Sequence, residues 1–215
     1  PGMHMLSCLQ AVAHGSDAVL YFQWRKGRGG FEKFHGAVID HKNGENTRTF
    51  RETAQVGERL RKMESFPLES VNRARAAIIF DWENWWALED MTGPRLDIDY
   101  VKTILMHYQV FWESGVDVDF IGMDEPLDEY RLVCAPVNYL YKKGYPEKVE
   151  NYVKNGGIYV TTCFSGMVDE RTLCFTKKHP LEDVLGVVQE EIDAPSEEFP
   201  NSVIFHGESF RAGNL

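Results

Sequence analysis

The chain has 215 residues, of which 43% are hydrophobic and 26% are charged. This is the composition of a globular protein, with room for one large domain or two modest ones. The formal net charge of −10 at pH 7 argues against nucleic acid as a partner. We expect no membrane association either, because no apolar run approaches the length of a membrane-spanning helix.

The charge is unevenly distributed along the chain. Residues 1–65 hold 10 basic and 7 acidic residues, a net charge of +3, whereas residues 66–215 hold 13 basic and 26 acidic residues, a net charge of −13. The change coincides with SFPLES, which interrupts the periodic pattern. We therefore predict two domains, residues 1–65 and residues 72–215.

The four cysteines, Cys8, Cys134, Cys163 and Cys174, form no C-x-x-C pair. This spacing favours reduced thiols in a cytoplasmic protein over disulfides or a metal site. The first residues, PGMHMLSCLQ, lack the basic flank and long apolar core of a signal peptide. They begin with proline, which suggests a chain cut from something longer.

The first domain reads as helix, strand, long loop and helix. Residues 2–15 have apolar side chains at helical spacing, and Gly15 is suited to end the helix. DAVLYFQW (17–24) is a short apolar run that predicts a buried strand, and residues 47–63 predict a second helix. A lone strand has no sheet, so we expect the remainder of the sheet to come from elsewhere.

The second domain alternates short apolar strands with helices. Strands are predicted at 74–81, 118–122, 131–136, 158–163 and 202–207, and helices at 97–115 and 145–157. In the first of these helices Asp97 or Asp99 is suited to cap the start, and the repeating apolar residues are Val101, Ile104, Leu105, Tyr108, Phe111 and Trp112. The pattern indicates a doubly wound α/β domain with a parallel sheet.

The first strand of that sheet is followed by DWENWWALED, which contains no glycine. A dinucleotide site needs a G-x-G-x-x-G turn there, so we predict no nucleotide cofactor. Trp82, Trp85 and Trp86 are typical of interfaces and of sugar-binding sites, and we place interface packing first.

Cys163 follows a predicted strand, in TTCFSG. A thiol at such a turn is the nucleophile of amidotransferase-like α/β enzymes, whose elbow needs small residues on both sides. Here Thr161 and Ser165 stand in place of the two glycines, which favours an ordinary buried thiol.

Glu32 and His35 follow the basic loop RKGRGG, which comes directly after DAVLYFQW. A Glu-x-x-His pair binds metal in di-iron bundles, but the chain does not supply the four helices that this needs. The alternative is sugar recognition at the end of a barrel strand, where a carboxylate and an imidazole bind hydroxyls.

YFQWRKGRGGFEKFHG, NTRTFRE and FDWENWWALE, in this order, resemble the bacterial β-galactosidases of glycoside hydrolase family 42 over nearly the whole chain. The resemblance implies that residues 1–65 are the last strand and helices of a (β/α)8 barrel. It also implies that residues 72–215 are most or all of a flavodoxin-like α/β trimerisation domain, so that the chain is a C-terminal part of a homotrimeric β-galactosidase.

The resemblance assigns the galactose-binding residues as Phe22, Glu32, Lys33, Phe34 and His35. Trp24 and Arg25 shape the strand end. The family's acid/base and nucleophile glutamates end the fourth and seventh barrel strands, so the resemblance implies that neither is present and that this chain alone is inactive. The four cysteines do not match the zinc cluster of some relatives.

Two other classes of function stay open on the sequence. One is an independent oligomerisation or ligand-binding α/β module with no hydrolase history. The other is an amidotransferase-like enzyme that uses Cys163 as its nucleophile.

Overall fold

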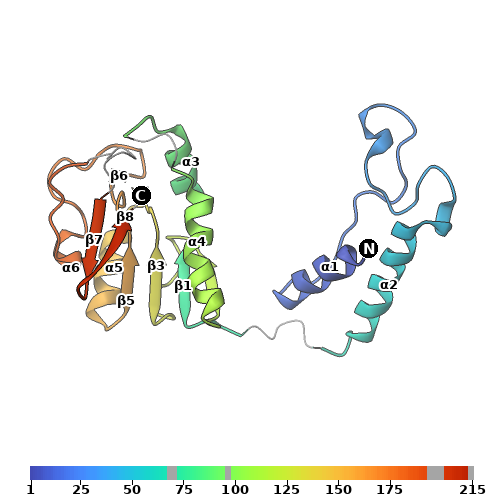
Figure 1. Cartoon of the computed structure of the whole chain (residues 1–215), viewed down its shortest axis with the longest axis horizontal. Helices are drawn as coiled ribbons and strands as arrows, with labels where there is room; N and C mark the ends of the chain where they lie inside the picture. The colour runs from blue at the N-terminus through green and yellow to red at the C-terminus, as the bar shows by residue number, and fades with distance from the viewer. Residues whose placement is uncertain (67–71, 95–97, 193–200, 213–215) are drawn as a thin grey trace. The chain divides into compact units, whose positions relative to one another are not determined.

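The computed structural model describes residues 1–66, 72–94, 98–192 and 201–212. The chain divides into two compact units, Pro1–Asn72 and Arg73–Leu215 (Figure 1). Each unit is described by itself.

The first unit is built around two helices that pack together, α1 (Met3–Ala13) and α2 (Arg48–Lys62). Thr47 caps α2, its hydroxyl accepting a hydrogen bond from the Phe50 N–H, as expected of a threonine before a helix. Two short 3-10 helices, η1 (Phe31–Phe34) and η2 (Gly44–Asn46), lie on the connection between them. Both helices confirm the sequence prediction.

The prediction of a buried strand at residues 17–24 is wrong. No strand is assigned to residues 17–24, and the described part of the first unit forms only one isolated parallel bridge, between Arg25 and Ile39. Leu20, Phe22 and Trp24 are 91%, 77% and 62% exposed. A strand is assigned and buried only when a neighbouring strand satisfies its backbone groups, and this unit supplies no sheet.

The second unit contains the predicted parallel sheet. Four strands lie in the order β2-β1-β3-β5, and every neighbouring pair is parallel: β2 (Val118–Ile121), β1 (Ala76–Ile79), β3 (Leu132–Ala135) and β5 (Ile158–Thr161). In chain order this is 2-1-3-4, the order of flavodoxin-like sheets. The predicted fold class is therefore confirmed.

Helices cover both faces of this sheet. Alternate residues of β1 point to opposite faces, so Ile78 packs with α4 (Tyr100–Glu113) whereas Ala77 packs with α5 (Tyr145–Lys154). The helix α6 (Glu182–Leu185) lies on the α5 side. The helix α3 (Trp82–Asp90) begins directly after β1 and contributes a side chain to each cluster. Figure 1 shows the strands between α4 and α5.

The helix α4 is shorter and buries a narrower face than predicted. Asp99 caps its start, the carboxylate accepting a hydrogen bond from the Lys102 N–H at 2.9 Å, while the alternative cap, Asp97, lies outside the described residues. Ile104 is buried as expected. Leu105 and Trp112 are 55% and 68% exposed, because only a narrow stripe of the helix contacts the sheet.

The strand predicted at residues 202–207 exists, but it does not join the parallel sheet. It belongs to β7 (Asn201–Phe205), which pairs antiparallel with β8 (Glu208–Ala212) in a hairpin. A two-residue turn, His206 and Gly207, lets the strand pair with its immediate successor. The short parallel pair of β4 (Leu140–Tyr141) and β6 (Val168–Asp169) was not predicted, since two residues carry no period.

Among the described residues, no helix is both long and apolar enough to cross a membrane.

Gly157 tests the packing of α5 on the sheet. A Cβ at this position would overlap the ring of Tyr152, whose hydroxyl donates to the Ile158 carbonyl oxygen at 3.2 Å. Gly157→Ala is therefore expected to lower the free energy of unfolding by about 1–3 kcal/mol, as overpacking does. Chemical denaturation measures this. Asn155→Ala, at an exposed position two residues earlier, is the matched control, and equal effects would contradict the packing argument.

Candidate functional site

Four of the five residues predicted to bind a sugar lie on one turn of the first unit. Glu32, Lys33 and Phe34 belong to η1, and His35 follows it, its N–H donating to the Glu32 carbonyl oxygen at 3.0 Å. All four side chains are exposed, Phe34 by 81%. The structure therefore gathers a carboxylate, an ammonium, a ring and an imidazole on one short accessible segment.

This turn sits in a loop whose two ends are bonded together. The Val38 N–H donates to the Gln23 carbonyl oxygen at 3.0 Å, and the Ile39 N–H donates to the Trp24 carbonyl oxygen at 2.7 Å. Phe22 lies just before this closure and points into solvent, 77% exposed. The five predicted residues thus belong to one closed loop and the residue that precedes it.

An ion pair reinforces the closure. Lys26 Nζ lies 2.8 Å from Asp40 Oδ2. The hydrogen bond from Lys26, followed by one from the His41 N–H, lowers the pKa of the Asp40 carboxyl. Within the described part of the chain, no three His, Cys, Asp or Glu side chains converge as metal ligands would.

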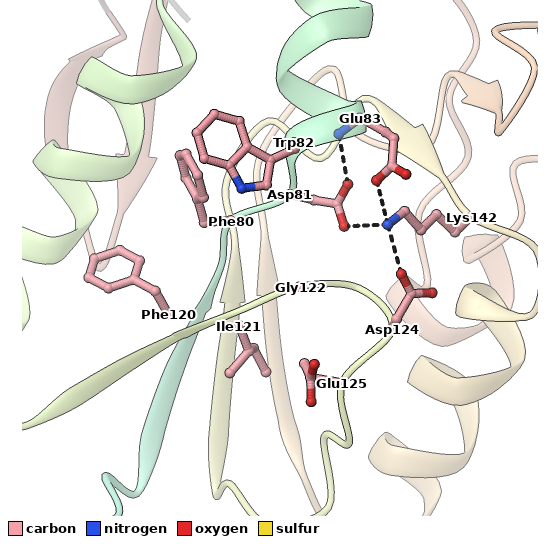
Figure 2. Close-up of a pocket in the computed structure, with 10 residues that line it drawn as sticks. All are labelled: Phe80, Asp81, Trp82, Glu83, Phe120, Ile121, Gly122, Asp124, Glu125 and Lys142. Carbon is pink, nitrogen blue, oxygen red and sulfur yellow. Dashed lines mark hydrogen bonds and ion pairs between the residues drawn. The ribbon is translucent and has the colours of Figure 1, made fainter. Parts of the chain in front are cut away.

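A second candidate site is a pocket of about 340 Å³ in the second unit. It opens beyond the carboxyl ends of β1 and β2, the usual position of ligand sites in open α/β sheets. Figure 2 shows the side chains around it. The lining residues are Phe80, Asp81, Trp82, Glu83, Phe120, Ile121, Gly122, Asp124, Glu125 and Lys142.

Asp81 organises this pocket. One carboxylate oxygen caps α3, accepting from the Glu83 and Asn84 N–H groups at 3.1 and 3.4 Å. The other accepts from the Met123 N–H at 3.1 Å and lies 2.9 Å from Lys142 Nζ. A side chain that is 3% exposed therefore joins three segments of the unit: the start of α3, the backbone after β2 and Lys142 after β4.

Lys142 bridges three carboxylates. Its Nζ lies 2.9 Å from Asp81, 2.5 Å from Glu83 and 2.8 Å from Asp124, as Figure 2 shows. Burial opposes the charge on Lys142, but the carboxylates outweigh it and raise the pKa of the ammonium. Burial likewise favours protonation of Asp81, yet Lys142 and the Met123 N–H bring the pKa of Asp81 below its ordinary value.

Sequence reasoning missed this cluster. An aspartate directly after the first parallel strand is a signal for a helix cap, and it could have identified Asp81. Nothing in the sequence places Lys142 beside it, 61 residues later, because that contact depends on how the strands are ordered in the sheet.

The three predicted interface tryptophans lie on α3, but they do not play equal parts. Trp82 and Trp86 are 56% and 59% exposed, whereas Trp85 is half-buried against Phe80, with ring centroids 5.8 Å apart. Trp82 stacks on Trp85 at 5.3 Å. Trp85 thus supports a surface patch that is formed by Trp82 and Trp86.

Cys163 lacks the features of a catalytic thiol. Cys163 is exposed, so the expectation of a buried thiol is wrong. Desolvation by its surroundings nevertheless raises the pKa of the thiol, whereas a nucleophilic cysteine needs a lowered pKa. The left-handed backbone of the turn falls on Phe164, at φ 62°, one residue after the thiol that an elbow would strain. This geometry favours an ordinary thiol.

Two family models match the chain in sequence order. A model described as "Beta-galactosidase" matches residues 1–63, and one described as "Beta-galactosidase trimerisation domain" matches residues 74–215. The chain belongs to the β-galactosidases of glycoside hydrolase family 42. The predicted family resemblance is confirmed.

Curated relatives in this family are close in sequence. β-Galactosidase Pbg of Clostridium perfringens is 50% identical over 206 residues, 94% of this chain and 30% of the relative. β-Galactosidase BglY of Alicyclobacillus acidocaldarius is 50% identical over 197 residues, 90% of this chain and 28% of the relative. The chain thus spans somewhat less than a third of the curated relatives it matches.

Solved structures of β-galactosidases share the fold. A catalytic mutant of Gan42B, a β-galactosidase from G. stearothermophilus, superposes with a TM-score of 0.90 at 42% identity, covering 98% of this chain and 31% of that one. The β-galactosidase of Bacillus circulans sp. alkalophilus gives a TM-score of 0.91 at 39% identity, covering 99% and 33%.

The ion pairs of Lys142 with Asp81, Glu83 and Asp124 predict that the stability of the second unit depends on pH. Lys142→Met leaves the Asp81 carboxylate buried without its cation, so we expect a loss of about 2–4 kcal/mol of unfolding free energy at neutral pH. The Asp81 pKa is lowered in the folded state, so its contribution is present above the ordinary aspartate pKa and is lost as the pH falls below about 4.

The difference in unfolding free energy between wild type and Lys142→Met should therefore become smaller in acid. Urea denaturation at a series of pH values measures it. Lys143→Met, at the exposed neighbouring position, is the matched control. A difference that stays constant down to the acid limit of folding would contradict the ionic account.

Proposed function

We propose that this chain forms part of a retaining β-galactosidase that hydrolyses terminal, non-reducing β-D-galactosides. The observation that carries this proposal is the match of both units, in order, to models of β-galactosidase segments. Retaining hydrolysis needs two carboxyl groups about 5–5.5 Å apart, an acid/base and a nucleophile. We assign neither role to a residue of this chain, and we expect the chain alone to be inactive.

In this proposal the first unit holds the sugar. Glu32 and His35 hydrogen-bond its hydroxyls, Phe22 covers its apolar face, and Lys33 and Phe34 belong to the same binding segment. The chemistry supports these roles, because charged and imidazole groups bind hydroxyls while aromatic faces pack on apolar C–H surface. The accessibility of all five side chains supports them as well.

The second unit supplies the assembly surface of a homotrimer. Two exposed indoles on one helix form an apolar patch of the kind that marks a protein interface. We further propose a cytoplasmic location, since all four cysteines are free thiols.

The sugar-binding roles can be tested in a chimera in which this chain replaces the aligned 206 residues of the C. perfringens relative. The chimera is expected to hydrolyse a chromogenic β-galactoside. Glu32→Gln and His35→Gln should each lower kcat/KM by about 10- to 100-fold, the cost of losing a hydrogen bond between a charged or strongly polar group and a hydroxyl.

Glu45→Gln, at an exposed position on η2, is the control and should leave kcat/KM unchanged. Sizing and circular dichroism confirm that each variant folds. If folded Glu32→Gln and His35→Gln chimeras hydrolysed the substrate as well as the control, the assignment of these residues would be wrong.

The assembly surface can be tested on the 215-residue chain by light scattering on a sizing column. We expect a mass near three times 24.7 kDa for the wild type. Trp82→Ala and Trp86→Ala together should shift it toward the monomer, because they remove the exposed patch. Trp112→Ala, at a comparably exposed position on α4, should not. Dissociation by Trp112→Ala alone would locate the interface elsewhere.

A further inference from the structure

The side chains that line the pocket beyond β1 and β2 carry a net negative charge, and the nearby Lys148 ammonium bonds the backbone carbonyl oxygens of residues 123–125. Four carboxylates line the pocket, those of Asp81, Glu83, Asp124 and Glu125, against the single ammonium of Lys142. The formal charge of these lining side chains is therefore −3. The Glu83 and Asp124 side chains are 54% and 77% exposed, so part of this charge faces the opening. Such a pocket attracts a cation.

The remaining walls of the pocket are aromatic. Phe80, Trp82 and Phe120 line it beside the carboxylates, and Figure 2 shows the rings of Phe80 and Trp82 next to each other. The stacking of Trp82 on Trp85 fixes the indole in place. A planar guanidinium suits this combination, because it stacks on aromatic faces and pairs with carboxylates through a fork of N–H groups.

We propose that this pocket receives an arginine side chain from a second copy of the chain. The inference rests on the assembly proposed above and names the polar anchor of its interface. Trp82 belongs both to the pocket wall and to the exposed patch, and its ring lies 6.3 Å from that of Trp86. The pocket and the apolar patch are thus one continuous surface.

Charge complementarity supports another copy of the chain as the source of the arginine. A ring of three identical chains is closed by heterologous contacts, in which one surface meets a different surface of the next copy. The acidic part of this chain, residues 66–215, has a net charge of −13, whereas residues 1–65 have a net charge of +3. The exposed arginines of that basic part are Arg25, Arg28, Arg48, Arg51, Arg59 and Arg61.

A sugar ligand is the competing occupant, since carboxylates and indoles also bind carbohydrate. A neutral sugar would leave the net negative charge of the lining side chains unchanged, whereas a guanidinium reduces it. The charge therefore favours the cation. Galactose is included in the test as the competing ligand.

The test measures the dissociation constant of the assembly by sedimentation, at low and high salt. Glu83→Gln with Asp124→Asn removes two pocket charges without changing side-chain shape. This double variant is expected to raise the dissociation constant by about tenfold or more at low salt, and to reduce its dependence on salt. Glu89→Gln with Asp90→Asn is the matched control, because both residues are exposed on the same helix.

A second measurement needs no variant. Arginine hydrochloride should dissociate the wild-type assembly more strongly than sodium chloride or lysine hydrochloride at equal ionic strength, because free arginine competes for the pocket. Galactose should have no effect. Equal action by the three salts, or dissociation by galactose, would overturn the inference.

The outcomes separate this inference from the assembly on which it rests. An assembly that depends on Trp82 and Trp86, but responds alike to the pocket variant and its control, overturns the arginine anchor and leaves the assembly intact. A wild-type chain that stays monomeric overturns both.

Discussion

The architecture of the second unit depends on one buried carboxylate at the end of its first strand. Asp81 caps α3, bonds the backbone after β2 and pairs with Lys142 beyond β4, so a single side chain fixes where three segments meet. Asn84, one turn later and fully buried, extends the clamp by bonding backbone groups of Val137 and Leu140. Burying a charge is costly unless it is paired and fully hydrogen-bonded, and this site meets both conditions.

The first unit differs from the second because its large apolar side chains are exposed rather than buried. Its segment at residues 17–24 exposes large apolar side chains, and only four hydrophobic residues of the described unit are buried: Cys8, Val38, Ile39 and Val56. The local sequence encodes a strand, but a strand is completed by partners that lie elsewhere in sequence. The closed loop bearing Glu32 and His35 is held by backbone bonds and by the Lys26–Asp40 pair, so its local geometry persists without a sheet.

The contrast between the two units explains how much of the structure could be predicted from the sequence. The period of apolar residues identified α1, α2, α4, α5 and the four parallel strands, because those elements bury a face at a regular spacing. The period of apolar residues does not show which strands pair with each other, or how much of a helix face contacts the sheet. Residues 202–207 form a strand in a hairpin rather than in the sheet, and Leu105 and Trp112 follow the helical period yet remain exposed. The family motifs predict a sugar-binding segment at Phe22 and residues 32–35, and this stays a prediction. The place of Lys142 in the pocket could not be predicted, because it depends on the order of the strands in the sheet.

The two parts of the chain differ in net charge, +3 for residues 1–65 and −13 for residues 66–215, and this difference is suited to their proposed roles. A sugar site gains from groups that donate and accept hydrogen bonds on an accessible loop, which the basic first unit provides. An assembly surface gains from a rigid support, and α3 provides one, because the same Asp81 that caps it also holds the pocket beside it. Opposite net charges on different surfaces favour contacts between unlike faces, and repeated contacts of that kind produce a closed ring rather than a two-fold pair.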